Sequence, residues 1–439
     1  MNIADYLKTE ILQWPRWLNY ILLKCNIFGA YVYGRSYLKA KKNINTTNTE
    51  KKLLEMVNYA IKKVPYYRVR YGHLKITNIN DFYREINFID KTEVMNHWNE
   101  FIPDDIDWSK CKKGTTGGTS GKPLKLIVPL NRYAIELAFI HQLWFKTGWK
   151  YHTRGVIRNH SLNGKDYVIN PVTKEIIFDA FKISDTYVKT IINTLKKFNV
   201  KFIQTYPSTA YQFCKICQQN NLETHFIHSF LCGSEGITDE QDTYFKAQGI
   251  NIYSWYGHSE KLILAGYDYQ QQGFKVENKY GFFELIDNQN KKIETNDIMG
   301  EMVGTTLYNK HMPLIRYRTG DYTQIKNLSH NSIILNKIYG RWDKSIIYKN
   351  DGTTTSLTAL NLHGEFHNHI DGIQYIQEKK GELIVLIIKN SQYSDKDELF
   401  IKEHISNAMG KSSSVNIRYV KKLIFQENGK FLPLISKLQ

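Results

Sequence analysis

The sequence lacks the features of secreted and membrane-spanning proteins. Its five cysteines form no even, closely spaced framework, which indicates a reducing compartment rather than a disulfide-stapled scaffold. It also lacks an N-terminal signal with an apolar core and a small-residue cleavage site, and no uncharged apolar run is long enough to span a bilayer. These absences predict a cytoplasmic location, with peripheral contact at the inner membrane face as the alternative.

Neither an aromatic RNA-binding signature nor a helix-turn-helix pattern accompanies the positive charge, so we expect no nucleic-acid partner. The 59 Lys and Arg residues outnumber the 42 Asp and Glu residues, and the net charge of +17 favours anionic partners such as nucleotides, coenzyme A or acidic lipid. The chain has 439 residues without an internal repeat or a low-complexity linker, enough for about two or three globular domains.

A zinc site is disfavoured, although five potential ligands fall in one short stretch: Cys214, Cys217, His225, His228 and Cys232. Cys214 and Cys217 share a helical pattern with Phe213, and Cys232 ends an apolar strand. We expect these cysteines to be small core residues.

The first 45 residues alternate aromatic and apolar side chains with Lys and Arg. This pattern is typical of a helix that packs on a main domain, and also of a segment that lies on a membrane surface. We favour packing on the main domain and retain membrane contact as the alternative.

From residue 50 onward, helical patterns alternate with short apolar strands, which predicts an α/β fold. The expected strands of the main domain are 123–128, 155–158, 201–204, 228–232, 250–254, 281–287 and 301–307. The expected helices are 49–63, 130–147, 184–198, 207–220 and 238–247. A smaller α+β unit is expected at the C-terminus, with strands 345–348, 372–378, 382–389 and 415–420, a hairpin at 379–381, and helices 357–369 and 395–409.

A glycine-rich run, TGGTSGKP from Thr116 to Pro123, has the residue types of a phosphate-binding loop. Its glycines allow close backbone approach, its hydroxyls are short donors, and Lys122 adds a cation. It is not a Walker loop, which would require glycine at Thr116 and Ser or Thr at Pro123, and it contains no G-x-G-x-x-G pattern. The alternative is an ordinary surface turn.

A second group, YSWYGHSE, follows an apolar strand at Ile250 and Ile252. Tyr256 offers a ring for stacking on a base, and Glu260 offers an oxygen ligand for magnesium. The alternatives are a core aromatic for Tyr256 and a solvated helix start for Glu260.

A third group, PLIRYRTGD, places Asp321 just past an expected Thr-Gly turn. A carboxylate there can accept hydrogen bonds from the two hydroxyls of a ribose, or it can cap an ordinary turn.

A fourth group, GRWD from Gly340 to Asp343, completes a series that resembles the motifs of the adenylate-forming (AMP-binding) superfamily. The chain is most similar to the phenylacetate–coenzyme A ligase branch, especially relatives associated with capsular and other surface polysaccharide synthesis. The resemblance covers about residues 50–435 and rests on five segments in order. These are TGGTSGKP, YPS (206–208), GSE (233–235), YGHSE (256–260) and MPLIRYRTGD (312–321).

The resemblance implies a large ATP- and acyl-binding domain (46–342), a small mobile lid domain (343–439) with its hinge at Asp343, and ATP and Mg²⁺ as ligands. Glu260 would bind the metal and Asp321 the ribose. Arg341 would contact the phosphate or the ribose. The implied nucleotide-binding residues are Thr116, Gly117, Gly118, Thr119, Ser120, Gly121, Lys122, Gly233, Ser234, Glu235, Tyr256, Gly257, Ser259, Asp321 and Arg341. The implied acid pocket contains Tyr206, His258 and His160.

The late catalytic lysine of the superfamily corresponds to Lys430 in ENGKF, with Lys437 as a rival. Its ammonium would neutralise charge between an incoming carboxylate and the α-phosphate. The hinge motif of the family commonly has two acids in succession, whereas here Lys344 follows Asp343.

The implied reaction joins a small carboxylic acid to AMP and then transfers the acyl group to a thiol, such as coenzyme A, or to an amine. It needs no nucleophilic side chain, in agreement with the lack of a Ser-His-Asp or Cys-His arrangement. The competing class is a binding or scaffold protein that retains the fold without turnover.

Overall fold

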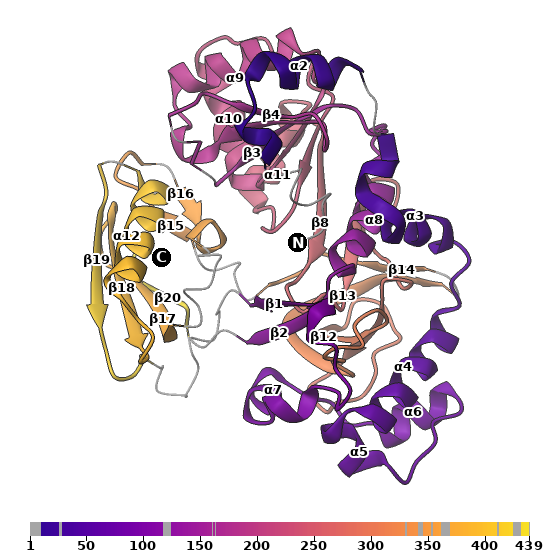
Figure 1. The fold of residues 1–439 in the computed structure, drawn as a ribbon. Helices are drawn as coiled ribbons and strands as arrows, with labels where there is room; N and C mark the ends of the chain where they lie inside the picture. Colours follow the sequence, from indigo (N-terminus) through magenta and orange to yellow (C-terminus); the bar gives the residue numbers. More distant parts are fainter. Residues whose placement is uncertain are drawn as a thin grey trace.

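The computed structural model describes residues 10–25, 29–116, 124–159, 161–162, 164–329, 332–340, 346–352, 354–360, 369–410, 412–424 and 432–438. The expected α/β fold is confirmed (Figure 1). No helix among these residues is both long and apolar enough to cross a membrane.

One large sheet of twelve strands runs through the described part of the chain, in the order β11-β12-β13-β14-β10-β9-β8-β7-β6-β3-β5-β4. Within it, β8, β7, β6, β3 and β5 are mutually parallel, and β4 and β9 pair antiparallel at the two sides of this section. The strands of this section are β3 (Arg154–Arg158), β4 (Val168–Asn170), β5 (Glu175–Asp179), β6 (Phe202–Thr205), β7 (Ser229–Cys232) and β8 (Ile252–Gly257). The antiparallel strands are β9 (Leu264–Asp268), β10 (Gly273–Val276), β11 (Gly281–Ile286), β12 (Met299–Thr306), β13 (Tyr317–Ser329) and β14 (Ser332–Leu335).

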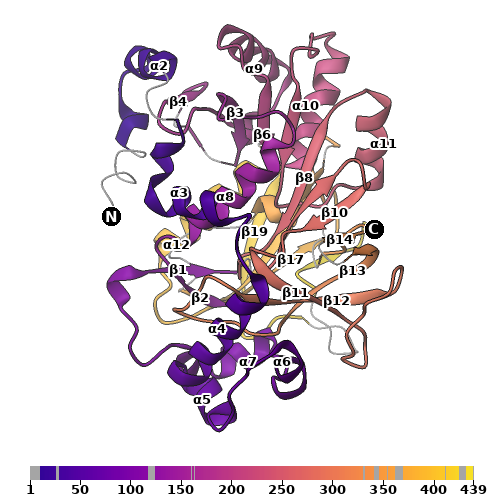
Figure 2. The ribbon, with the colours of Figure 1, turned by 90° about the vertical axis from the view of Figure 1, so that its right-hand side faces the viewer.

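Helices cover both faces of the parallel section because successive residues of each strand point to opposite sides. Phe230 and Cys232 of β7 pack against one face, while Leu231 between them packs against the other. Figure 2 shows α10 (Pro207–Gln219) and α11 (Asp239–Ala247) on one side of β8, and α8 (Arg132–Phe145) with α3 (Gly34–Asn43) on the other. The helix α9 (Asp185–Lys197) contributes to the same core as α10.

The three cysteines that we expected to be core residues are buried beneath these helices. Cys214, Cys217 and Cys232 belong to one apolar cluster. Burial raises the pKa of the Cys217 thiol to about 12 and raises that of Cys232 further above its usual range. His228 donates from Nε2 to the Thr147 carbonyl at 3.1 Å. The interpretation of the cysteines as packing residues is confirmed.

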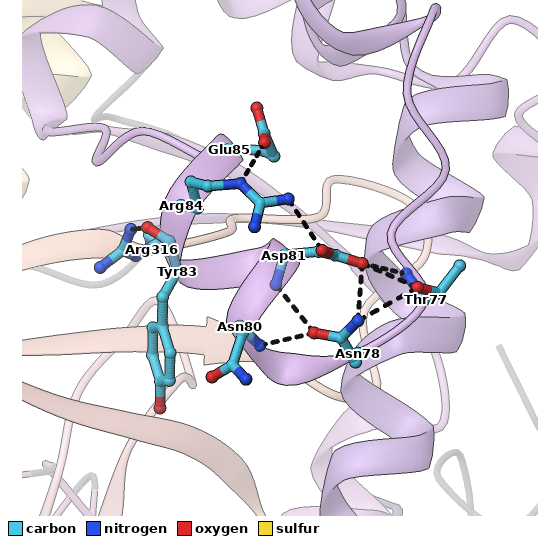
Figure 3. A network of polar contacts seen from close by, with 8 residues as sticks. All are labelled: Thr77, Asn78, Asn80, Asp81, Tyr83, Arg84, Glu85 and Arg316. Carbon is cyan, nitrogen blue, oxygen red and sulfur yellow. Dashed lines mark hydrogen bonds and ion pairs between the residues drawn. The ribbon is translucent and has the colours of Figure 1, made fainter.

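Short helices follow the N-terminal segment and cover the antiparallel section. They are α4 (Thr49–Lys63), α5 (Pro65–Tyr71), α6 (Ile79–Glu85) and α7 (Lys91–Asn96), with the 3-10 turns η3 (Trp98–Phe101) and η4 (Trp108–Lys110). The start of α6 shows why such a short helix forms. The Asn78 side chain accepts the backbone N–H groups of Asn80 and Asp81, at 2.9 and 3.0 Å, and Asp81 accepts from Thr77 (Figure 3).

The N-terminal segment contacts both α8 and the far edge of the sheet. It contains η1 (Ile11–Gln13), α2 (Arg16–Cys25), η2 (Gly29–Tyr33) and α3. Asn19 of α2 donates to the Ile169 carbonyl in β4 at 3.2 Å, and the Tyr37 hydroxyl of α3 bonds His141 of α8 at 2.8 Å.

The C-terminal residues form a separate small sheet in the order β19-β18-β17-β20. Its strands are β17 (Ile370–Gln377), β18 (Glu382–Lys389), β19 (Ser414–Tyr419) and β20 (Leu434–Ser436). The same unit contains a separate two-stranded sheet of β15 (Ile346–Tyr348) and β16 (Thr354–Ser356), the 3-10 turn η6 (Leu357–Leu360) and the helix α12 (Asp395–Met409). Of the expected helix 357–369, only the 3-10 turn η6 lies within the described residues. Phe181, from η5 (Ala180–Lys182) of the large domain, packs on the core of this unit.

Arg316, in the PLIRYRTGD segment, is buried and forms hydrogen bonds to distant parts of the large domain. Its Nη2 and Nε donate to the two carboxylate oxygens of Glu284 in β11, at 2.8 and 3.3 Å. Its Nη1 donates to the carbonyls of Ile86 and Tyr83 at the end of α6, at 2.7 and 3.2 Å. Figure 3 shows Arg316 beside Tyr83. The residue also has a φ of +51°, a conformation that side chains rarely adopt. These contacts therefore hold the chain at the start of β13.

Replacing Arg316 by Met should lower the free energy of unfolding by about 3–5 kcal/mol, because Glu284 would remain buried without its counterion. Urea denaturation of the purified protein measures this change. Arg84→Ala is the matched control, since Arg84 forms exposed ion pairs with Asp81 and Glu85 and should leave the unfolding midpoint unchanged. Equal midpoints for the two variants would contradict the structural role of Arg316.

Candidate active site

The sequence motifs lie where the parallel strands end. In an open α/β sheet, ligands bind beyond the carboxyl ends of the parallel strands. At this edge, Tyr206 follows β6, Gly233–Glu235 follow β7, and Tyr256 lies near the end of β8. Segments that are far apart in the sequence therefore meet along one edge.

A hydrogen bond connects the segments after β6 and β7. The Glu235 carboxylate accepts the backbone N–H of Ser208 at 3.2 Å, at the N-terminus of α10. Burial raises the pKa of the Tyr206 hydroxyl, and Glu235 raises it further, while Arg158 lowers it. The YPS and GSE motifs thus form one local structure, with Ser234 at a φ of +70°.

Trp255 explains the glycine of the GSE motif and was not singled out by the sequence analysis. A Cβ on Gly233 would lie 2.5 Å from the Trp255 ring, and one on Gly257 would lie 2.9 Å from it. The indole therefore packs directly on the backbone at Gly233 and Gly257. Any other residue at these two positions would have a Cβ that collides with the ring. The alternation of apolar residues in β8 could have indicated that Trp255 shares a face with Tyr253.

Tyr256 and Asp321 are in direct contact, although 65 positions separate them in the chain. The Tyr256 hydroxyl donates to Asp321 Oδ2 at 2.6 Å. Asp321 is only 7% exposed and lies within β13, so the expected Thr-Gly turn before it is wrong. Instead, Gly320 adopts a φ of +73° next to a register shift between β12 and β13, and the strand continues past this irregularity.

His258 and Glu260 form a second buried pair just beyond β8. The backbone N–H of Ile263 donates to His258 Nε2 at 3.1 Å, so the neutral ring carries its proton on Nδ1. Nδ1 lies 3.0 Å from Glu260 Oε2 and donates to it. The Tyr317 hydroxyl donates to Glu260 Oε1 at 3.3 Å. Glu260 is 6% exposed, so the alternative of a solvated helix start is wrong.

The expected phosphate loop joins the two strands of a hairpin. β1 (Cys111–Thr115) pairs antiparallel with β2 (Lys125–Pro129). Beyond the last pair, the Thr116 N–H donates to the Leu124 carbonyl at 3.0 Å, and the Leu124 N–H donates to Thr116 Oγ1 at 2.9 Å. Thr116 is therefore used to close the base of the loop.

Several predicted site residues lie outside the described residues, and their roles stay predictions. They are Gly117, Gly118, Thr119, Ser120, Gly121, Lys122, His160, Arg341, Asp343 and Lys430. The exposed Ser259 lies between His258 and Glu260.

Arg158 is a further candidate that the sequence analysis missed. It ends β3, next to the segment after β6, and its Nε is buried without a hydrogen-bond acceptor among the described residues. A polar residue at the last position of a buried parallel strand was the available signal, because such positions face the ligand edge.

The carboxylates of the site could hold Mg²⁺ only together with the phosphates of a bound ligand. Within the described ranges, no group of three or more His, Cys, Asp or Glu side chains could hold a metal. Mg²⁺ is commonly held by one or two carboxylates together with substrate phosphates. Glu260, oriented by His258 and Tyr317, is a carboxylate of that kind.

Solved structures show which class of protein has this fold. The chain is similar to 2-hydroxyisobutyryl-CoA ligase in the postadenylation state in complex with R3-HIB-AMP, with a TM-score of 0.53, 15% identity and 88% coverage of each chain. The same ligase in complex with 2-HIB-AMP and CoA, in the thioesterification state, matches with a TM-score of 0.53, 14% identity and 88% coverage of each chain. The chain therefore has the two-domain fold of the adenylate-forming ligases.

The particular relatives are CapK proteins. Residues 346–437 match the family model described as the CapK C-terminal domain. Protein CapK of Staphylococcus aureus is 23% identical over 444 residues, covering 93% of this chain and 94% of that protein. Together with the fold, these matches confirm the resemblance on which the site residues were assigned.

Tyr256→Phe should lower the free energy of unfolding by about 1.5–3 kcal/mol, because the buried Asp321 carboxylate would lose a hydrogen bond that its charge strengthens. Urea denaturation measures the loss. Tyr322→Phe is the control, since that side chain is 44% exposed on the neighbouring residue of β13. If both variants unfold at the wild-type midpoint, the Tyr256–Asp321 contact is not a stabilising one.

Proposed function

We propose that this protein activates a carboxylic acid with ATP to form an acyl-adenylate and then transfers the acyl group to a thiol or an amine. The observation that carries the proposal is the convergence of two hydrogen-bonded pairs, Tyr256 with Asp321 and His258 with Glu260, just beyond the parallel strands. The Tyr256 and His258 rings lie 5.9 Å apart between their centroids and join the two pairs. These residues come from two separate motifs, and the superfamily uses such groups for adenine, ribose and metal.

The chemistry needs positioning and charge stabilisation more than a nucleophilic side chain. The acid's own carboxylate attacks the α-phosphate of ATP, the bond to the β-phosphate breaks, and pyrophosphate leaves. The loop from Thr116 to Lys122 would hold the β- and γ-phosphates, and Arg341 would contact phosphate or ribose. Lys430 would neutralise the charge between the two reacting groups.

His258 acts in this proposal as a positioning residue for Glu260. Both of its ring nitrogens bond to protein groups, one to Ile263 N–H and the other to Glu260. Magnesium bound at Glu260 would offset phosphate charge. The acid pocket would then depend on Tyr206 and His160 rather than on a direct contact with His258.

The acceptor is proposed from the relatives. A neighbouring structure, 2-hydroxyisobutyryl-CoA ligase, is solved with 2-HIB-AMP and CoA, which supports coenzyme A as the thiol acceptor. The similarity to CapK agrees with the resemblance to relatives associated with surface polysaccharide synthesis, where an amine on a sugar would be the alternative acceptor. The small domain would rotate at Asp343 between the two half-reactions. The competing class remains a nucleotide-binding protein without turnover.

Lys430→Ala should reduce acid-dependent exchange of labelled pyrophosphate into ATP by about a hundredfold to a thousandfold, because one charge-stabilising donor is lost. The acids to test are acetate, 2-hydroxyisobutyrate, phenylacetate and an amino acid, each with and without coenzyme A. Lys437→Ala is the matched control, since Lys437 is exposed and pairs with Glu378 at 2.6 Å. A larger loss in the control would reassign the catalytic lysine, and no exchange by the wild-type protein with any acid would favour the binding class.

His258→Ala should raise the Mg²⁺ concentration needed for half-maximal exchange by about 10–100-fold, as expected when an orienting partner of a metal ligand is removed. His258→Asn retains an N–H donor and should recover part of the affinity. Ser259→Ala, at the exposed position between the pair, is the control. An unchanged Mg²⁺ requirement in His258→Ala would exclude the positioning role.

A further inference from the structure

The short helix α2 is fixed to the protein by one face only. Asn19 and Leu23 are buried on that face. The Asn19 side chain donates to the carbonyls of Ile11 and Ile169, at 2.6 and 3.2 Å, which attaches the helix to β4 at the edge of the large sheet. The orientation of α2 about its own axis is therefore determined by the fold.

The opposite face of α2 exposes large apolar side chains. Trp17 is 66% exposed and Ile21 is 48% exposed, one helical turn apart. Trp14, just before the helix, is 40% exposed, and Tyr31, in the separate 3-10 turn η2, is 81% exposed. Tryptophan and tyrosine at such positions are typical of helices that lie in the interface of a bilayer.

Acidic residues are absent from the whole segment that carries this face. Between Ile11 and Thr49 there is no Asp or Glu, although the chain average would place about four there. The same segment has six exposed cations: Arg16, Lys24, Arg35, Lys39, Lys41 and Lys42. Figure 2 shows the ribbons of α2 and α3 on the same side of the molecule, and α3 carries four of these six cations.

The charge decides which partner fits this surface. A second copy that docked the same surface on itself would bring two sets of cations together without any carboxylate from either segment. An anionic bilayer instead offers negative headgroups to the lysines and an apolar layer to Trp17 and Ile21. The ten residues of α2 are too few to cross a bilayer, so the contact is peripheral.

We propose that the outer face of α2, together with the basic residues of α3, binds the surface of an anionic lipid bilayer. The contact holds the large domain against the membrane by the edge that carries β4. This inference does not depend on the proposed ligase activity, and it extends the weaker of the two alternatives that the N-terminal sequence pattern left open.

Flotation of the full-length protein with vesicles tests the proposal. The wild-type protein should float with vesicles that contain phosphatidylglycerol, and remain unbound with pure phosphatidylcholine vesicles or at high salt. Trp17→Ser combined with Ile21→Ser should reduce the bound fraction at least about tenfold. The control replaces Trp108 and Leu399 by Ser, because these side chains are similarly exposed, by 50% and 58%, on other surfaces.

A second pair of variants separates charge from apolar contact. Lys39→Gln with Lys42→Gln should weaken binding about tenfold or more, whereas Lys396→Gln with Lys402→Gln on α12 removes the same charge and should bind as wild type. Equal flotation of all variants, or no flotation of the wild-type protein, would overturn the proposal. So would a dimer in sedimentation velocity that the Trp17 and Ile21 substitutions dissociate, since a second copy would then cover this face.

Discussion

The buried ion pair between Arg316 and Glu284 determines where the later site residues lie. One guanidinium binds the carboxylate of β11 and two carbonyls at the end of α6, so three segments distant in sequence share a single charged group. Both side chains are shielded from water, with exposed fractions of 7% for Arg316 and 0% for Glu284. Such a pair tolerates little displacement, because any shift leaves a charge unpaired in an apolar environment. β13 begins at the next residue and places Asp321 within hydrogen-bond distance of the Tyr256 hydroxyl.

The candidate site repeats this design in two smaller pairs. Tyr256 orients Asp321, and His258 orients Glu260, so each carboxylate that is assigned to a ligand already has a donor from the protein. A buried carboxylate that is already oriented by protein donors loses little freedom when a ligand binds. The fold thus places two buried acidic groups, Asp321 within β13 and Glu260 just beyond β8, in a protein whose net charge is strongly positive.

Regular elements with strong patterns were predictable from the sequence. The helices α4 and α12 begin and end at the residues expected from their apolar spacing, and both follow polar capping residues, Asn48 and Ser394. The Thr-Gly turn expected just before Asp321 was wrong, because glycine before aspartate is typical of turns and also of an irregularity within a strand. Arg158 and Trp255 were missed for another reason: their position at a strand end and the alternation within β8 were visible in the sequence, but neither residue belongs to one of the five motif segments.

The sequence alone determined the alternation of helices and strands, the order of the motifs and the residue types available for chemistry, because these depend on local periodicity and composition. It could not determine which motifs touch. Hydrogen bonds such as Tyr256 to Asp321 join residues 65 positions apart, and their existence depends on strand order and register, which long-range packing selects. The same holds for α2: its amphipathic pattern was evident, but only its hydrogen bonds to β4 decided which face is buried and which face meets solvent.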